Sequence, residues 1–312
     1  MYVKSNTYNE SLDIYRDFFF RYIMKQPEQS TTSHLSKPSN LVAIQGIRGS
    51  FHHIVSQKYF GNDVEIKEFL SFDETVNCLV EGVCDSAIIA LENSIAGSII
   101  PNYALIDKNA LKIVGEQYLD IQHHLMAFPN QDISEISEVY SHPMALLQCK
   151  SFFKSFPHIK LIEDKDTAEV AQRIRKNELK NVAAIASQLA SEIFELNILA
   201  ESIQTIKHNE TRFVIVKRDT DLKNEKSANK ASLKFELDHK RGSLAAILNV
   251  LSDCKLNLTK IQSLPKIETP WKYAFFVDVT FENIADFEKA RAIIILMAQE
   301  FKLLGIYNKA SL

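Results

Sequence analysis

A short, unbroken apolar run, Ser86–Leu91, sets the strongest limit on the fold, because every residue after its serine is hydrophobic. A run of this length is typical of a strand that is buried on both faces of a sheet. Another short apolar segment, Leu41–Gln45, precedes it, and helix-like stretches lie between the two. One of these stretches opens with Ser71 and Glu74, which have the spacing of a capping box. The order strand, helix, strand predicts a mostly parallel sheet covered by helices.

A second α/β unit begins near Leu119 and repeats this alternation. Strands are predicted at 125–127, 139–140 and 182–186. Helices are predicted after Ser141-His142-Pro143, where the proline falls early in the first turn, near Asp166 and from Ser187. We therefore expect two lobes, the first made of about 41–118 plus 205–217 and the second of about 119–204.

The last part of the chain has a different order of elements. Residues 218–230 are rich in charge and have no apolar periodicity, which is typical of a linker. Strands are then predicted at 232–237, 257–263, 271–279 and 303–307, with helices after Gly242 and over 287–301. The order βαββαβ is that of the ferredoxin-like fold, so we expect residues 231–312 to form a separate α+β domain.

Composition excludes several classes of function. A chain of 312 residues that is 46% hydrophobic can form two or three globular domains. The net charge of −3, with lysine and arginine spread along the chain, gives no basic patch for nucleic acid. The longest apolar run, Ala292–Ala298, is too short to cross a membrane.

Two features concern the location of the protein. Residues 1–40 carry no secretory signal, and we predict a mobile leader; a later start at Met24 and a short docking helix are the alternatives. The four cysteines show no metal-ligand spacing and lie among apolar neighbours, so we predict buried free thiols in a reducing cytoplasm. They are Cys78, Cys84, Cys149 and Cys254.

The chemistry concentrates in Asn209-Glu210-Thr211-Arg212-Phe213, which opens a β-branched apolar run. Because side chains of a strand alternate between faces, Thr211 and Phe213 are predicted to point one way and Arg212 the other. A hydroxyl beside an aromatic ring, with the fixed cation of Arg212 entering from behind, suits a small anionic substrate that carries an oxygen that must leave. The alternative for Thr211 is a threonine that only opens a strand, and for Arg212 a surface ion pair.

Several further segments match one family in the same order. They are Gly46–Phe51, Glu92-Asn93-Ser94 with Gly97, Ser141-His142-Pro143 with Gln148-Cys149, Thr167-Ala168, Ala183–Ala186, the Thr211 segment, and Trp271 with Tyr273. Over about 41–312 the chain resembles prephenate dehydratase with a C-terminal ACT regulatory domain. The resemblance implies a two-lobed module like that of periplasmic binding proteins. It also implies decarboxylative dehydration of prephenate to phenylpyruvate, in phenylalanine biosynthesis, with no metal or organic cofactor.

Within this resemblance, Thr211 is the group expected at the leaving hydroxyl. Glu92, Asn93 and Gln148 are the other expected catalytic residues, where Glu92 either pairs with a cation or donates a proton. The expected substrate-binding residues are Ser50, Ser94, Asn209, Arg212 and Phe213. The alternatives are a capped turn for Asn93 and Ser94, a core amide for Gln148, and packing for Phe213. His123, His124 and His142 are expected to be structural.

The resemblance also implies a site for phenylalanine in the last domain, at Gly242-Ser243-Leu244-Ala245 and Gln262-Ser263-Leu264-Pro265. Gln262 and Leu264 stand where the family usually has a glutamate and an arginine, which weakens the expectation of feedback by phenylalanine. A homodimer or homotetramer is expected. Arogenate dehydratase, which acts on the amino analogue, and a non-catalytic amino-acid sensor are the rival interpretations.

Overall fold

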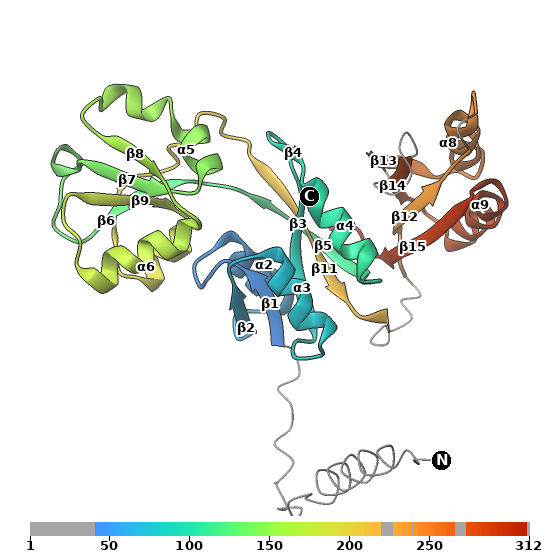
Figure 1. Ribbon diagram of the computed structural model, residues 1–312, viewed down its shortest axis with the longest axis horizontal. Coiled ribbons are helices and arrows are strands. Elements are labelled where there is room, and N and C mark those ends of the chain that lie inside the picture. Colours follow the sequence, from blue (N-terminus) through green and yellow to red (C-terminus); the bar gives the residue numbers. More distant parts are fainter. Residues whose placement is uncertain (1–40, 220–226, 239, 266–272, 311–312) are drawn as a thin grey trace, which may run out of the picture. The chain divides into compact units, whose positions relative to one another are not determined.

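The computed structural model describes residues 41–219, 227–238, 240–265 and 273–310, which form three sheets with their helices (Figure 1). The predicted leader and Trp271 lie outside the described residues, as does most of the predicted linker. The fold class predicted from the sequence is confirmed: two α/β sheets are followed by an antiparallel sheet in βαββαβ order. The expectation of mostly parallel sheets is wrong, because β11 (Glu210–Lys217) pairs antiparallel in the first sheet and β6 (His124–Ala127) in the second. The domain boundaries themselves remain predictions.

The first sheet has the strand order β2-β1-β3-β11-β5, with β4 paired to β3 (Figure 1). Strands β1, β2 and β3 are parallel, whereas β11 runs antiparallel to both of its neighbours. The strands are β1 (Leu41–Gln45), β2 (Glu65–Phe69), β3 (Ser86–Asn93), β4 (Gly97–Ser98), β5 (Lys112–Asp120) and β11 (Glu210–Lys217). Two distant parts of the sequence thus meet at the pairing of β3 with β11.

Three helices belong to this sheet, namely α2 (Phe51–Phe60), α3 (Phe72–Val80) and α4 (Ile100–Lys108). The Ser50 and Ser71 side chains cap α2 and α3 by accepting backbone N–H bonds. Helix α4 begins instead with a proline in its first turn. The sequence analysis placed no element at β2, α4 or β5.

The second sheet has the order β10-β6-β9-β7-β8. Its strands are β6 (His124–Ala127), β7 (Glu138–Ser141), β8 (Lys160–Glu163), β9 (Val182–Ala186) and β10 (Asn197–Ala200). Its helices are α5 (Pro143–Cys149), α6 (Thr167–Asn177) and α7 (Gln188–Ile193), with the short turns η1 (Ile133–Glu135) and η2 (Phe152–Ser155). Strand β9 and the starts of α6 and α7 agree with the prediction.

The third sheet is antiparallel, with the order β13-β14-β12-β15. Its elements are β12 (Lys230–Glu236), α8 (Ser243–Asp253), β13 (Asn257–Pro265), β14 (Tyr273–Thr280), α9 (Ile284–Met297) and β15 (Glu300–Tyr307). The predicted helix over 287–301 is wrong at its end, because Phe301 belongs to β15. The Phe301 side chain packs on the core of this sheet. The strand β15 brings it there, whereas a further turn of α9 would not.

A buried network of charges joins β5 and β11 to the third sheet. Arg212 donates to Glu116 at 2.7 Å, to Asp278, and to the Tyr307 hydroxyl at 2.9 Å. Lys230 donates to both oxygens of Glu116, at 2.9 and 2.8 Å. The two positive and two negative charges therefore balance. These four residues and Tyr307 are each no more than 5% exposed. Buried charges persist only when they are paired in this way.

Close backbone approach accompanies this network. A Cβ on Gly305 of β15 would lie 2.1 Å from the carbonyl oxygen of Ile113 in β5. Any larger residue would push the two strands apart. Glycine therefore permits this close approach of β15 to β5.

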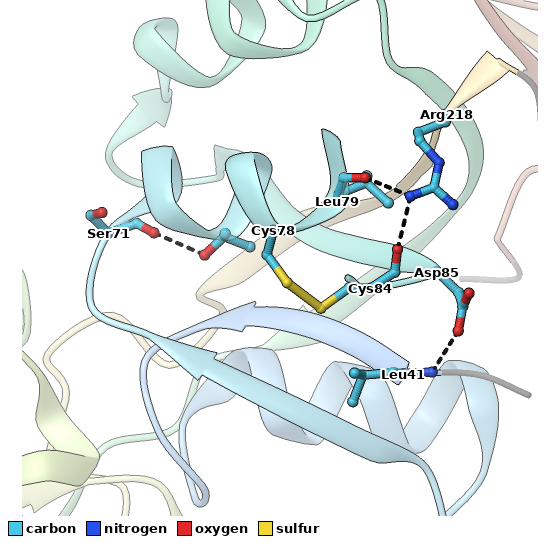
Figure 2. The surroundings of a disulfide bond; sticks show 8 residues. Leu41, Ser71, Cys78, Leu79, Cys84, Asp85 and Arg218 are labelled. Atoms are coloured by element: carbon cyan, nitrogen blue, oxygen red, sulfur yellow. Dashed lines mark hydrogen bonds between the residues drawn. A yellow bond between two sulfur atoms is a disulfide. The ribbon is translucent and has the colours of Figure 1, made fainter. Parts of the chain in front are cut away.

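The prediction that all four cysteines are free thiols is wrong for two of them. Cys78 and Cys84 form a disulfide, as Figure 2 shows, while Cys149 and Cys254 are free. Helix α3 ends two residues after Cys78, and the turn that follows brings the two Cα atoms to 5.8 Å. In Figure 2 Arg218 holds this turn, donating to the carbonyl oxygens of Leu79 at 2.7 Å and Cys84 at 3.3 Å. A local turn of this kind leaves no spacing signal in the sequence.

In the part of the chain that the structure describes, no helix is long and apolar enough to cross a membrane.

The buried network yields a stability prediction. Replacing Asp278 by alanine leaves the Arg212 guanidinium buried with half of its charge partners removed. We expect Asp278→Ala to lower the free energy of unfolding by about 3–5 kcal/mol, as for other broken buried pairs. Denaturant unfolding of the full chain would measure the change.

The matched control is Glu288→Ala, which removes an exposed partner of Arg291 on α9. We expect this variant to lose at most about 1 kcal/mol. Equal losses for the two variants would show that the buried network carries no special weight.

Candidate functional site

The candidate site is a cavity of about 650 Å³ beside the pairing of β3 with β11. Elements of both α/β sheets contribute to its wall. The polar residues of the wall include Ser50, His52, Asn93, Asn102, His123, His142, Gln148, Lys165, Asp166, Thr167, Asn209 and Thr211. Phe51, Phe72, Ile121 and Phe213 are among its apolar residues. A cavity that is largely apolar, with a few converging polar groups, is typical of a small-molecule site.

Strand register brings the central pair of polar residues together. Asn93 at the end of β3 lies opposite Thr211 at the start of β11, although 118 residues separate them. The Asn93 side-chain amide donates to the Thr211 hydroxyl at 2.9 Å and to Asn209 Oδ1 at 2.7 Å. Residues that the sequence motifs singled out separately are therefore hydrogen-bonded to one another.

The orientation of Asn93 is fixed by the backbone. Its Oδ1 accepts the N–H groups of Ile95 at 3.0 Å and Ala96 at 2.8 Å, and only an oxygen can accept them. Its Nδ2 must then face Thr211, so the Thr211 oxygen accepts a hydrogen bond. The hydroxyl proton of Thr211 is consequently left to donate elsewhere, and Thr211 lines the cavity.

The same row of polar groups continues to α5 and to the segment before β6. Asn209 Nδ2 donates to Gln148 Oε1 at 2.9 Å, and that oxygen also lies 2.9 Å from His123 Nε2. The five residues Thr211, Asn93, Asn209, Gln148 and His123 thus form one continuous hydrogen-bonded row. The sequence analysis identified four of them and assigned His123 to a structural role.

Three helix N-termini reach the wall of the cavity. The first turns of α2, α3 and α6 reach its wall through Phe51, Phe72 and Thr167. Backbone N–H groups and the helix dipole favour an anion at such positions. Lys165, which is exposed, adds a full positive charge. The carboxyl groups of Asp73 and Asp166 lie in the same wall, so attraction for a small organic anion is confined to the helix ends and Lys165.

Two histidines in the wall are held neutral. Burial lowers the pKa of His52 to about 3 and the pKa of His123 to about 4. The His52 ring packs edge-on against Phe213, with ring centroids 4.9 Å apart, and against Phe72 at 5.5 Å. No spacing signal in the sequence singles out His52, because its neighbours meet it only in the folded chain.

Asp166 is a further wall residue that sequence reasoning did not assign to the site. Its Oδ1 accepts the N–H groups of Ala168 and Glu169, both at 2.9 Å, and so caps α6. Burial nevertheless raises the pKa of the Asp166 carboxyl, because the residue is 8% exposed. The helix-start signal at this position was visible in the sequence, but its place in a cavity was not.

Three predicted site residues do not line the cavity. Glu92 pairs with Lys260 of β13, and Arg212 belongs to the buried network. Strand alternation explains both, because each precedes or follows a wall residue and therefore faces the other side of the sheet. Ser94 is exposed, and its hydroxyl accepts the N–H of Glu210 at 2.9 Å. These three side chains therefore do not line this cavity, and the pairing of Glu92 with Lys260 is the first of the two arrangements expected for it.

Ser50 and Phe213 do line the cavity. The Ser50 side chain accepts the N–H of His53 at 3.3 Å, so its hydroxyl proton is directed away from that bond. Phe213 is 2% exposed and packs on His52. Both predicted positions are therefore at the site, in capping and packing arrangements.

The predicted effector segments lie on the third sheet and its helix α8. Gly242 precedes α8 with φ +84°, and Ser243, Leu244 and Ala245 form its first turn. Gln262, Ser263, Leu264 and Pro265 end β13. Leu264 is 8% exposed and packs in the core, so its side chain is not presented to a ligand. The Gln262 side chain donates to the Ser263 carbonyl oxygen at 2.9 Å.

Comparison with known proteins identifies the family. Residues 42–221 match the prephenate dehydratase family. The chain belongs to this family. The match spans the two α/β sheets and ends before β12, so it does not include the third sheet.

Two curated relatives illustrate the relationship. The bifunctional chorismate mutase/prephenate dehydratase of Enterobacter agglomerans is 29% identical over 284 residues, covering 89% of this chain and 73% of the relative. The chloroplastic arogenate dehydratase/prephenate dehydratase 2 of Arabidopsis thaliana is 34% identical over 246 residues, covering 76% of this chain and 64% of the relative. The chain thus spans about two thirds to three quarters of the length of these relatives.

Solved structures share the fold. Prephenate dehydratase from Arthrobacter aurescens, solved with L-Phe, has a TM-score of 0.77 at 24% identity, over 86% of this chain and 89% of that one. GqqA, described as a quorum quenching acylase, has a TM-score of 0.75 at 23% identity, over 86% and 98%. The similarity therefore extends over the described residues of all three sheets.

The buried histidines yield a prediction about pH. The pKa of His52 is 6.5 when unfolded and about 3 when folded, so between these values the unfolded state binds the extra proton. Stability should therefore fall as the pH is lowered from about 6.5 toward 3. We expect His52→Phe, which keeps a packed ring but cannot titrate, to reduce the slope by up to about 1.4 kcal/mol per pH unit.

Denaturant unfolding at pH 7 and pH 5 would measure this slope. His158→Phe is the control, because His158 is exposed and outside the cavity wall. An unchanged slope in His52→Phe would contradict the assignment of acid sensitivity to this buried ring.

Proposed function

We propose that the protein is a prephenate dehydratase, a carbon–oxygen lyase that converts prephenate to phenylpyruvate, water and carbon dioxide. The observation that carries the proposal is the Thr211 hydroxyl. It accepts from Asn93 at 2.9 Å and therefore has its proton left for a group in the cavity. Membership of the family supports the same reaction.

The reaction needs little from the protein besides geometry and one proton donor. The bond between the ring and its carboxylate breaks, and its electron pair enters the ring. The ring then expels the hydroxyl on the opposite carbon, which takes up a proton and leaves as water. The products are aromatic phenylpyruvate and carbon dioxide, so all atoms balance and the step is downhill.

We assign Thr211 to the leaving hydroxyl. A threonine hydroxyl is a weak acid, so it acts by donating a hydrogen bond or relaying a proton. Asn93 polarises this hydroxyl, because the bond that it donates draws electron density from the oxygen. Asn209 accepts from Asn93 and donates to Gln148, whose own NH₂ group is a further amide donor in the wall.

The substrate carries two carboxylates, and the wall attracts one of them while it surrounds the other with apolar groups. The helix N-termini and Lys165 favour the side-chain carboxylate, which stays charged throughout. The apolar part of the wall, around Phe213 and Ile121, disfavours the ring carboxylate as an anion. Loss of that charge as carbon dioxide is thus assisted by its surroundings.

We further propose that the third sheet is an ACT-type regulatory domain that binds L-phenylalanine. Its βαββαβ order and the glycine before α8 support this, because the first N–H groups of a helix can meet a carboxylate. A homodimer or homotetramer and a cytoplasmic location are parts of the same proposal. The Cys78–Cys84 disulfide removes one argument for that location.

The first test is turnover. We expect purified protein to form phenylpyruvate from prephenate. We expect Thr211→Ala to lower kcat by about 10²–10³-fold with little change in KM, as when a single transition-state donor is removed. Thr211→Ser keeps a hydroxyl and should retain most of the activity.

A stopped assay for phenylpyruvate gives kcat and KM with prephenate. With arogenate as substrate the product is phenylalanine, so that arm is followed by an assay for phenylalanine. Turnover of arogenate alone would replace the proposed substrate by its amino analogue. Normal turnover by Thr211→Ala would remove this residue from the mechanism.

A second test concerns the effector. Because Gln262 and Leu264 stand in place of charged residues, we expect phenylalanine to bind more weakly than in relatives that keep the charges. Gln262→Glu should strengthen binding about two- to five-fold, which corresponds to an exposed ion pair of up to about 1 kcal/mol. Calorimetry would show it, with Gln57→Glu on α2 as a control for net charge. Tight binding by the unaltered chain would overturn the idea.

A further inference from the structure

We propose that His123 is a positioning residue of this site, which holds the Gln148 amide so that its NH₂ group faces the substrate. The proposal rests on the proposed function, because it assigns a role in the same cavity. It concerns a residue for which sequence reasoning expected only a structural part.

The argument begins at the backbone anchors of Asn93 and follows the row outward. Asn93 Nδ2 donates to Asn209, so the atom of Asn209 that faces it must be an oxygen. The other end of that amide, Nδ2, then faces Gln148 at 2.9 Å, and it can only donate. The Gln148 atom that receives it must therefore be Oε1.

The same step fixes the tautomer of His123. Gln148 Oε1 lies 2.9 Å from His123 Nε2, and an amide oxygen cannot donate. His123 must therefore carry its proton on Nε2. Two donors, one from Asn209 and one from His123, hold the Gln148 oxygen from different elements.

The consequence is a directed donor. With Oε1 held by two bonds, the NH₂ end of Gln148 is turned away from the row, and Gln148 lines the cavity. Within the described residues, no hydrogen bond uses Gln148 Nε2 as a donor. It is available to an acceptor such as a carboxylate or keto oxygen of the substrate. Without His123 a single bond would hold the amide, and it could rotate.

His123 is itself rigid enough to act this way. Its backbone N–H donates to the Gln204 side chain at 3.0 Å, and its carbonyl oxygen accepts from Ile203 at 2.8 Å. Its ring meets Phe51 edge-on, with centroids 5.6 Å apart, and the residue is 4% exposed. Burial lowers the pKa of His123 to about 4, so the neutral ring persists at neutral pH.

The test uses two substitutions at this position. His123→Leu removes the donor, and we expect kcat/KM for prephenate to fall about 10–100-fold, since small misplacements of a binding group have effects of this size. His123→Gln places an amide N–H the same number of bonds from Cα as Nε2. We expect it to recover most of the loss, which a merely structural role would not produce.

A double-mutant cycle tests the route through Gln148. If His123 acts by holding this amide, His123→Leu should cost little once Gln148→Leu is present. Additive losses, or full activity in His123→Leu, would overturn the proposal. Thermal unfolding of each variant reports whether it is folded.

The matched control is His124→Leu. His124 is the adjacent residue, is 5% exposed, and accepts from Ser202 N–H at 3.4 Å without lining the cavity. We expect this variant to keep kcat/KM within about three-fold, as for a substitution outside the site. A loss equal to that of His123→Leu would assign the effect to packing and overturn the proposal.

The outcomes separate the proposal from the function on which it rests. If the unaltered chain does not turn over prephenate, the proposed function fails. If the unaltered chain is active and His123→Leu is equally active, only the positioning role fails.

Discussion

The antiparallel pairing of β11 with β3 organises the described molecule. Strand β11 comes from a distant part of the chain and runs antiparallel to β3. Strands β1 and β2, on the other side of β3, run parallel to it. One face of β11 presents Thr211 and Phe213 to the cavity, while the other presents Arg212 to the charge network. A single strand therefore contributes to both. A register shift of one residue would exchange these faces and destroy the two together.

This division explains why a buried arginine lies next to the proposed proton donor. The cation does not touch the cavity, yet it is held by Glu116, Asp278 and Tyr307. Two of those partners belong to the third sheet. Breaking a buried pair costs several kcal/mol, so movement of that sheet against β11 would be opposed strongly. The network therefore fixes the start of β11 against the third sheet.

Sequence reasoning agreed with the fold where the signal was local, and the motif residues discussed next lie in the wall of the cavity. The runs that became β3 and β9 are unbroken and apolar, and Asn93, Gln148 and Thr211 stood in segments that matched the family. It failed where partners are distant. The segment that forms β5 contains Glu116, which is buried because it pairs with Arg212 and Lys230. These partners are distant in the sequence, so no local pattern predicts the pairing.

Arg212 and Glu92 were predicted at the site but do not line the cavity, and distant partners again explain why. Strand alternation correctly predicted that Arg212 points away from Thr211. The sequence could not show that the carboxylates of Glu116 and Asp278 lie on that side. Glu92 is the same case, since its partner Lys260 comes from β13. Conversely, the place of His52 in the cavity wall was not predicted. Its ring partners, Phe72 and Phe213, come close to it only in the folded chain.

The charge of the cavity wall is the remaining physical question. A dicarboxylate would be bound most tightly by several cations, yet the two buried histidines of the wall are neutral. Binding the ring carboxylate strongly would stabilise the charge that must disappear, which lowers the ground state more than the transition state. Helix ends and Lys165 supply attraction, while neutral rings and Phe213 keep part of the wall apolar. A wall of this kind can hold one carboxylate and still favour the loss of the other.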